Sequence, residues 1–254
     1  GDPPLPSGGL PKYPWATFLI PLSVYMVGGV FEPLPPSEAS DGAEAAFRLA
    51  PDYRYYPLVY TIRIALTLLA MGLVWRGYRA FRWRLSPLSL VVGVLGAAAW
   101  IGLCKLQLEA RILESLGAEG LIDLGTRSAF NPLSEMAATP ALAYGFLAVR
   151  LLGLVLIVPI IEEFFLRGFA MRFAVDADWW AVPFGKVSPA AIVVGTALPM
   201  LMHPGELLAA AVWFSAVTWL MIRTRNIWDC VAAHAATNLL LGIYVLASGD
   251  WRLM

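Results

Sequence analysis

The stretch VPIIEEFFLRGF, residues 158–169, places three ionisable side chains in a strongly apolar sequence. Glu162 and Glu163 are adjacent carboxylates, and Arg167 follows Glu163 after four residues. Ionisable side chains are costly inside a lipid bilayer, and those that occur there usually serve a function. The stretch therefore predicts a membrane-spanning helix that carries a functional site.

The composition of the whole chain also indicates a membrane protein. Of its 254 residues, 59% are hydrophobic and 14% are charged, whereas soluble domains carry about 25% charged residues. The mean hydropathy is +0.69. A net charge of zero gives no reason to expect a nucleic-acid partner. The two cysteines, Cys104 and Cys230, lie in apolar surroundings and offer no secreted-type disulfide framework.

Long apolar runs predict the helices that cross the membrane. A run of about 18 or more apolar residues is long enough to span the bilayer. The predicted spans are residues 13–31, about 58–75, about 88–106, a fourth from about 140 through the opening stretch, 189–203, about 207–222 and 227–247. The fold class is therefore all-α, a polytopic membrane protein of seven transmembrane helices, or eight if residues 107–138 contribute another. We expect one domain over residues 1–254.

Basic residues in the loops predict the orientation of these helices, because short cytoplasmic loops are enriched in Lys and Arg. Between seven spans, one side receives Lys12, Arg76, Arg79, Arg82, Arg84, Arg167, Arg172, Lys186, Arg223 and Arg225. The other side receives Arg48, Arg54, Lys105, Arg111, Arg127 and Arg252. We expect the first side to be cytoplasmic and the protein to be a multi-pass protein of the inner membrane.

The spacing within EEFFLR divides its charged side chains into two sets. Glu163 and Arg167 are four residues apart, which predicts an ion pair along one helix face. Glu162 lies about 100° around the helix and is not neutralised by that pair. A carboxylate left without such a partner in an apolar site is a candidate general base. Pro159 lacks a backbone N–H and predicts a kink just before the motif.

Both histidines of the chain, His203 and His234, fall in predicted spans. A single histidine in an apolar segment is more often a satisfied core residue, but both histidines together beside a carboxylate pair favour a site. In HAATN, His234 and Asn238 are four residues apart and point the same way from one helix. Such a pair can donate two hydrogen bonds to one oxyanion. The alternative for Asn238 is a hydrogen bond that holds two helices together.

Taken together, these motifs resemble the CPBP family of intramembrane proteases, named for CAAX proteases and bacteriocin-processing enzymes and also called the Abi family. The family signature is EExxxR, then FxxxH, then HxxxN on later helices. Here the motifs are EEFFLR at 162–167, PMLMH at 199–203 and HAATN at 234–238. The resemblance covers about residues 140–247. Pro199 stands where the family usually has Phe, which affects the packing expected around His203.

The resemblance implies an Rce1-like fold and a peptidase without a metal or other cofactor. It implies that Glu162 and His203 activate a water, that His234 and Asn238 stabilise the oxyanion, and that Glu163 and Arg167 hold the helix and tune Glu162. The substrate would be a membrane-associated protein or peptide, cleaved within the lipid bilayer. The segments TRSAFNP and NLLLGIYVLASGDW also resemble a bacterial subgroup associated with exosortase protein-sorting systems, which implies such a system as a partner.

Three other functions remain open at this stage. Glu162, His203 and His234 would also suit zinc or iron in a metalloprotease, although no HExxH motif is present. Cys230 lies four residues before His234, as a thiol protease would require, but nothing in the sequence activates the thiol. A transporter or membrane scaffold could use the same buried charges, although no repeat is present in the sequence.

The depth of the catalytic residues presents a geometric difficulty. A helix from Pro140 to Phe173 would be roughly 50 Å long, too long for one straight crossing. Glu162 would then lie near its cytoplasmic end, whereas His203 would end a helix that runs the opposite way. We therefore expect a break or a strong tilt in the helix that carries EEFFLR.

Overall fold

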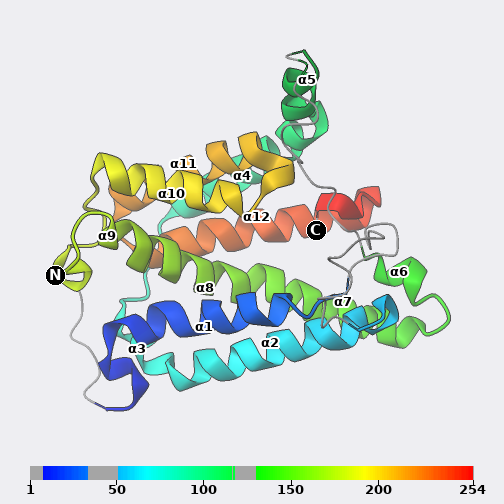
Figure 1. Ribbon diagram of the computed structural model, residues 1–254, viewed down its shortest axis with the longest axis horizontal. Helices are drawn as coiled ribbons and strands as arrows, with labels where there is room; N and C mark the ends of the chain where they lie inside the picture. The colour runs from blue at the N-terminus through cyan, green and yellow to red at the C-terminus, as the bar shows by residue number, and fades with distance from the viewer. Residues whose placement is uncertain (1–7, 34–50, 116, 118–129, 254) are drawn as a thin grey trace.

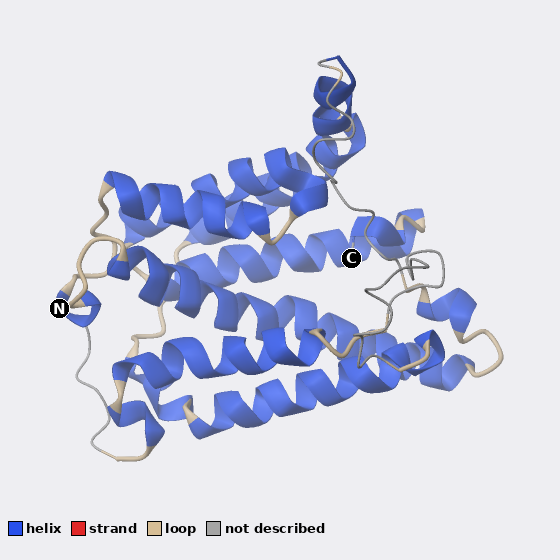
Figure 2. Ribbon diagram, in the orientation of Figure 1, coloured by secondary structure: helices blue, strands red, loops and turns tan. Residues whose placement is uncertain are grey.

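The computed structural model describes residues 8–33, 51–115, 117 and 130–253. Within these residues the chain is helical and contains no strand (Figure 2), so the predicted all-α class is confirmed. Apolar segments form helices because the bilayer offers no water partner to backbone N–H and C=O groups.

Seven apolar helical segments correspond to the seven predicted spans. Five are long and apolar enough to cross a membrane: Tyr53–Leu73, Pro87–Leu106, Pro140–Phe173, Pro204–Thr224 and Ile227–Ser248. Two are shorter, Pro14–Gly29 and Pro189–Leu201. In element names these are α1 (Pro14–Gly29), α2 (Tyr56–Leu73), α4 (Pro87–Leu106), α7 to α9, α10 (Pro189–Leu201), α11 (Leu207–Thr224) and α12 (Ile227–Ser248).

Short helices connect or extend these seven segments. They are η1 (Leu10–Lys12), η3 (Tyr53–Tyr55), α3 (Trp75–Ala80), α5 (Leu108–Ser115), α6 (Pro132–Glu135), η6 (Trp179–Ala181), η7 (Pro204–Glu206) and η8 (Trp251–Leu253). The predicted eighth span within residues 107–138 is not formed by the described part of that segment. That part consists of the one- to two-turn helices α5 and α6, and residues 116 and 118–129 lie outside the described residues.

The helix that carries EEFFLR is continuous, so the first of the two expected alternatives, a break, is wrong, and a strong tilt stays a prediction. It runs through α7 (Pro140–Leu152), a π-helical stretch η4 (Gly153–Ile157), α8 (Val158–Glu163), a second π-helical stretch η5 (Phe164–Ala170) and α9 (Met171–Phe173). Each π-helical stretch holds one extra residue per turn and re-aims the side chains that follow without interrupting the helix. Pro159 directly follows the first stretch.

The long helices lie side by side in three groups (Figure 1). The helix containing α8 and the helix α12 form the middle of the bundle. On one side α1 packs against α2, and on the other α4 packs against α11 and α12 while α10 packs against α11. The middle helices therefore have protein on both sides, which allows them to carry polar side chains that lipid would not tolerate.

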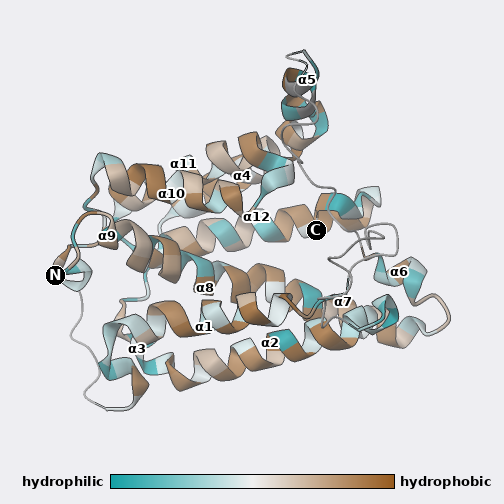
Figure 3. Ribbon diagram, viewed as in Figure 1, coloured by the Kyte–Doolittle hydropathy of each residue, from teal (hydrophilic) through white to brown (hydrophobic). Residues whose placement is uncertain are grey.

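Large apolar side chains on the outer faces of the bundle are exposed, as a lipid-facing surface requires. On α2 they include Leu58, Ile62, Leu66, Leu69 and Leu73, and on α4 Leu90, Val91, Val94 and Leu95. Figure 3 shows apolar colouring along the outer helices and hydrophilic patches within α8 and α12. A contiguous exposed apolar surface of this kind is typical of a membrane protein rather than a soluble monomer.

One end of the bundle is closed by an aromatic cluster. Phe18 contacts Phe81, Phe164, Trp179 and Trp180, with ring centroids 5.3–6.0 Å apart. Phe164 also contacts Tyr78, Phe81 and Trp228. We call these seven residues, Phe18, Tyr78, Phe81, Phe164, Trp179, Trp180 and Trp228, the aromatic cluster. Edge-to-face pairs predominate in it, which is the arrangement that ring quadrupoles favour.

Gly168 brings the helix of EEFFLR against this cluster. A Cβ at residue 168 would lie 2.4 Å from Cε1 of Phe18, which is far inside van der Waals contact. We expect Gly168→Ala to destabilise the protein by about 1–3 kcal/mol, the usual cost of overpacking a close-packed interior. Thermal unfolding in detergent measures the effect.

Gly72→Ala is the matched control, since Gly72 is also helical and a Cβ there meets no atom within 4 Å. It should leave the melting temperature unchanged or raise it slightly. Equal melting temperatures for the two variants would contradict the packing at Phe18.

Candidate active site

The four predicted catalytic residues line a single cavity of about 320 Å³ near the middle of the bundle. Glu162 comes from α8, His234 and Asn238 from α12, and His203 from the connection between α10 and α11. Other lining residues include Tyr25, Tyr60, Arg63, Trp100, Arg150, Leu154 and Trp213. Tertiary packing thus brings together side chains that lie 76 residues apart in sequence, from 162 to 238.

Glu163 forms the buried centre of the site. Its Oε2 lies 2.8 Å from Nη1 of Arg167, which confirms the ion pair predicted from their spacing, and both side chains are fully buried. Its Oε1 lies 2.9 Å from Nδ1 of His234. Since a carboxylate accepts, Nδ1 of His234 carries a proton in this contact. One carboxylate therefore links the EEFFLR helix to α12.

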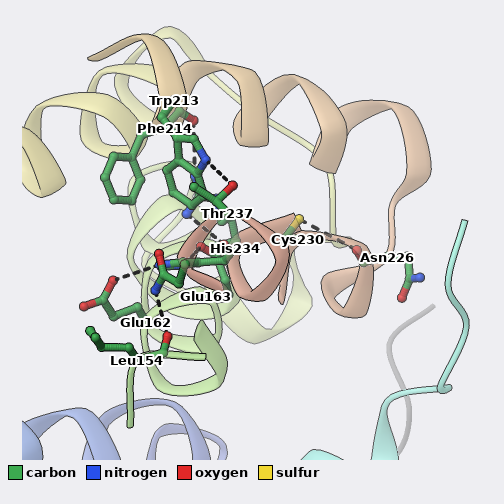
Figure 4. A network of polar contacts seen from close by, with 11 residues as sticks. Leu154, Glu162, Glu163, Trp213, Phe214, Asn226, Cys230, His234 and Thr237 are labelled. Carbon is green, nitrogen blue, oxygen red and sulfur yellow. Dashed lines mark hydrogen bonds and ion pairs between the residues drawn. The ribbon is translucent and has the colours of Figure 1, made fainter. Parts of the chain in front are cut away.

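The second nitrogen of His234 faces Glu162. Nε2 of His234 and Oε2 of Glu162 are 4.0 Å apart, too far for a direct hydrogen bond. Figure 4 shows the imidazole between the two carboxylates. The side chain of Glu162 is 19% exposed, whereas that of Glu163 is not exposed at all. Of the adjacent carboxylates, Glu162 is thus the one with access to the cavity.

Two residues that sequence reasoning missed support the His234 ring: Trp213 contacts the ring, and Thr237 holds Trp213. The ring of Trp213 lies 4.6 Å from that of His234, centroid to centroid, at an angle of 65°. Trp213 Nε1 donates to Thr237 Oγ1 at 3.0 Å, and that hydroxyl donates to the carbonyl of Gly93 at 2.9 Å. Thr237 sits within HAATN, so its position beside His234 was the available signal.

His203 lies beyond the helix in which it was predicted. The helix α10 ends at Leu201, and His203 follows it in the turn that leads to η7. Nδ1 of His203 contacts the carbonyl oxygen of Pro199 at 2.8 Å. A carbonyl only accepts, so Nδ1 donates and the tautomer places the basic lone pair on Nε2 when the ring is neutral. Pro199 thus holds His203 through its carbonyl, which proline retains.

Asn238 is held by a carbonyl that the π-helical stretch leaves without a partner. The N–H of Val158 donates to Gly153 instead of Leu154. With the same five-residue spacing, the donor to the Leu154 carbonyl would be the N–H of residue 159. That residue is a proline and has no N–H. Asn238 Nδ2 donates to the Leu154 carbonyl at 2.8 Å. This supports the helix-linking alternative for Asn238, while its second amide N–H remains available to the cavity.

Arg167 and Arg172 are buried helix residues and not loop residues, so neither counts toward the loop charges from which the orientation was predicted. Arg167 is fully buried beside Glu163 and also donates to the carbonyl of Phe214 at 3.2 Å. Arg172 is 1% exposed and donates to the carbonyls of Val182 and Trp180, each at 2.9 Å. Buried guanidinium groups occur where several acceptors satisfy them, as here.

The geometry gives little support to the two other catalytic sets, a metal site and a cysteine nucleophile. Among the residues that the structure describes, no group of three or more His, Cys, Asp and Glu side chains converges to hold a metal ion. Glu162, His203 and His234 thus share a cavity without forming a ligand set. Cys230 is fully buried, and its Sγ faces the carbonyl of Asn226 at 3.8 Å rather than the cavity.

Arg63, which interrupts the second predicted span, contributes to the cavity wall. Its Nη1 lies 2.6 Å from Glu32 Oε1, its Nε donates to the carbonyl of Tyr25 at 2.7 Å, and its guanidinium stacks on the Tyr25 ring at 3.5 Å. These contacts fasten α2 to the end of α1. The arginine within an apolar run was the signal for this position.

Comparison with known proteins agrees with the motifs. Residues 144–240 match the family model described as type II CAAX prenyl endopeptidase Rce1-like. This segment of the chain is therefore similar to the Rce1-like domain of the CPBP family, in agreement with the family predicted from the motifs. A search of curated proteins and a search of solved structures gave no match. The Rce1-like segment includes all three motifs and supports a CAAX-type membrane endopeptidase at the level of the family. A single domain over the whole chain stays a prediction.

The contact between Asn238 and Leu154 makes a double-mutant prediction. Asn238→Ala leaves the Leu154 carbonyl without a donor, and we expect a loss of about 1–3 kcal/mol in the free energy of unfolding. In a Pro159→Ala background, residue 159 regains an N–H. The same Asn238→Ala change should then cost about 1 kcal/mol less, because the two sites are coupled. Unfolding of the four proteins in detergent measures this coupling, and equal losses in both backgrounds would refute it.

Proposed function

We propose that the chain is an intramembrane endopeptidase that hydrolyses a peptide bond of a membrane-associated protein or peptide. The observation that carries this proposal is the single cavity lined by Glu162, His203, His234 and Asn238 within an apolar helical bundle. The Rce1-like match supports the reaction class. No nucleic acid or cofactor has a role in it.

Glu162 would act as the general base that removes a proton from the attacking water. It is the carboxylate exposed to the cavity, and Arg167 does not pair with it directly. His203 lines the same cavity and also a small apolar crevice that touches Glu162. A base and a histidine that converge on one water can transfer its proton to the leaving amine.

His234 and Asn238 would stabilise the tetrahedral oxyanion. The Nδ1–H of His234 is held by Glu163, so Nε2 can donate to an oxyanion only when the ring is an imidazolium. Asn238 would donate through the amide N–H that Leu154 does not use. Donors fixed before the reaction stabilise developing charge more than mobile donors do.

Glu163 would be a positioning residue. It fixes the tautomer and the orientation of His234 and neutralises Arg167, and it does not face the cavity. This differs from the sequence-based expectation only in adding His234 to its partners. Location in a bacterial inner membrane and an exosortase system as partner remain predictions from sequence.

The test separates the two carboxylates. Glu162→Gln should abolish proteolysis and leave the melting temperature nearly unchanged, because Gln keeps the shape and loses the base. Glu163→Gln should destabilise the protein by about 3–5 kcal/mol, because it leaves Arg167 buried without its counter-charge. The substrate fragment is found by comparing membrane proteomes of cells that express wild type or Glu162→Gln. Turnover and thermal unfolding are then measured on purified variants.

The same assay ranks the other residues of the site. His203→Ala should match Glu162→Gln in severity, since both serve one proton-transfer step. Asn238→Ala should lower turnover about a hundred- to thousand-fold, the usual effect of removing one oxyanion donor. An active Glu162→Gln together with a stable but inactive Glu163→Gln would reverse the roles of the two carboxylates.

The proposed mechanism also predicts that proteolysis survives exhaustive chelation. A water activated by glutamate needs no cation, whereas a zinc site loses its activated water with the metal. Activity is measured before and after dialysis against a strong chelator, with a known zinc protease as the positive control. Loss of activity that stoichiometric zinc restores would establish the metalloprotease alternative.

A further inference from the structure

The exposed charges differ between the two ends of the bundle. At the end that carries α3, α9 and the start of α12, eight basic side chains are exposed: Lys12, Arg76, Arg79, Arg82, Arg84, Lys186, Arg223 and Arg225. Four of them fall within residues 76–84, directly after a candidate span. We call this the basic end. Two exposed acidic residues, Asp176 and Asp178, accompany them among the described residues.

The opposite end carries fewer basic and more acidic side chains. Its exposed basic residues in the described part of the chain are Arg54, Lys105, Arg111 and Arg252, whereas Arg48 and Arg127 lie outside the described residues. Acidic residues at this end that are not buried include Glu32, Asp52, Glu109, Glu114, Glu135 and Asp250. Because positive charge is retained on the cytoplasmic side, the basic end faces the cytoplasm and this end faces outward.

The cavity extends from Glu162 toward the outward end. Its lining includes Glu32 just beyond the end of α1, Tyr56 at the first position of α2, and Leu253 in η8 after α12. These three segments lie together at the end of the bundle opposite α3 (Figure 1). Tyr25 and Tyr60 line the wall between them and Glu162. Tyrosine is a residue that membrane–water interfaces favour.

Toward the basic end the cavity is closed. The aromatic cluster lies there, and Phe18, Phe164 and Trp228 are 1%, 0% and 4% exposed. Arg167, which follows Phe164 of this cluster by three residues, is also fully buried. No residue of the aromatic cluster lines the cavity. A polypeptide that entered through the basic end of the bundle would have to displace close-packed rings to reach Glu162, which a packed interior resists.

We infer that the site receives its substrate from the extracytoplasmic side of the membrane. The substrate class is then a membrane-tethered polypeptide whose scissile segment lies on that side, such as the outward end of a membrane-anchored chain. In a helical segment the backbone carbonyls are already hydrogen-bonded. The segment that is cleaved must therefore be unwound when it enters, so that its scissile carbonyl can accept hydrogen bonds from donors of the cavity. The inference about the substrate rests on the proposed function, whereas the direction of access does not.

Labelling of single cysteines in intact cells tests the direction of access without requiring proteolysis. The background is Cys104→Ser, in which the remaining native thiol, Cys230, is fully buried and serves as an internal negative control. Reporters are Leu253→Cys at the mouth, Leu154→Cys within the cavity, and Leu85→Cys at the basic end, where Leu85 is 54% exposed. Tyr56→Cys is a second mouth reporter in case Leu253→Cys fails to accumulate.

A membrane-impermeant maleimide should label the mouth and cavity reporters in intact cells, at least tenfold more than Leu85→Cys. After the cells are opened, Leu85→Cys should label fully. If Leu85→Cys is labelled in intact cells and the mouth reporters are not, the orientation is the reverse of the one inferred and the inference is overturned. A cavity reporter that labels only from the cytoplasmic side, or from neither, would also overturn it. An active Glu162→Gln variant would instead defeat the proposed function and leave the labelling result standing.

Discussion

The rest of the site depends on one buried carboxylate, Glu163, which contacts a cation on its own helix and an imidazole on another. Its pairing with Arg167 makes the burial of both charges tolerable, since a lone buried charge would be strongly destabilising. Its contact with His234 then fixes α12 against the EEFFLR helix and sets which imidazole nitrogen faces Glu162. The adjacent carboxylate is left facing the cavity, so neighbouring residues of the same type have different environments.

An irregularity of the helix backbone fixes the position of the Asn238 amide. The first π-helical stretch and Pro159 together leave the Leu154 carbonyl without a helical partner, and Asn238 occupies it. A residue that the motif marks for catalysis is thereby also required by the helix opposite to it. Such double use is consistent with the cost of unsatisfied backbone groups inside a membrane, where water cannot replace a missing donor.

Glu162 and His203 meet in one cavity because the helix α10 is short, and not because the long helix that carries EEFFLR is broken. The helix α10 ends after 13 residues, so the chain turns back within the bundle and leaves His203 at the level of Glu162. Pro199 and His203 satisfy each other at that helix end. The aromatic cluster then closes the basic end of the site, and the cavity extends toward the opposite end.

The sequence by itself determined the helical class, the seven apolar segments, the Glu163–Arg167 pair and the family, because these depend on hydropathy, on four-residue spacing and on local motifs. It did not determine that Glu163 holds His234, that Asn238 satisfies Leu154, or that Trp213 and Thr237 support the imidazole. Nor did it predict that Arg167 and Arg172 are buried or that the long helix is continuous. Those features were decided by tertiary structure, because most of them depend on contacts between helices whose residues are distant in the chain.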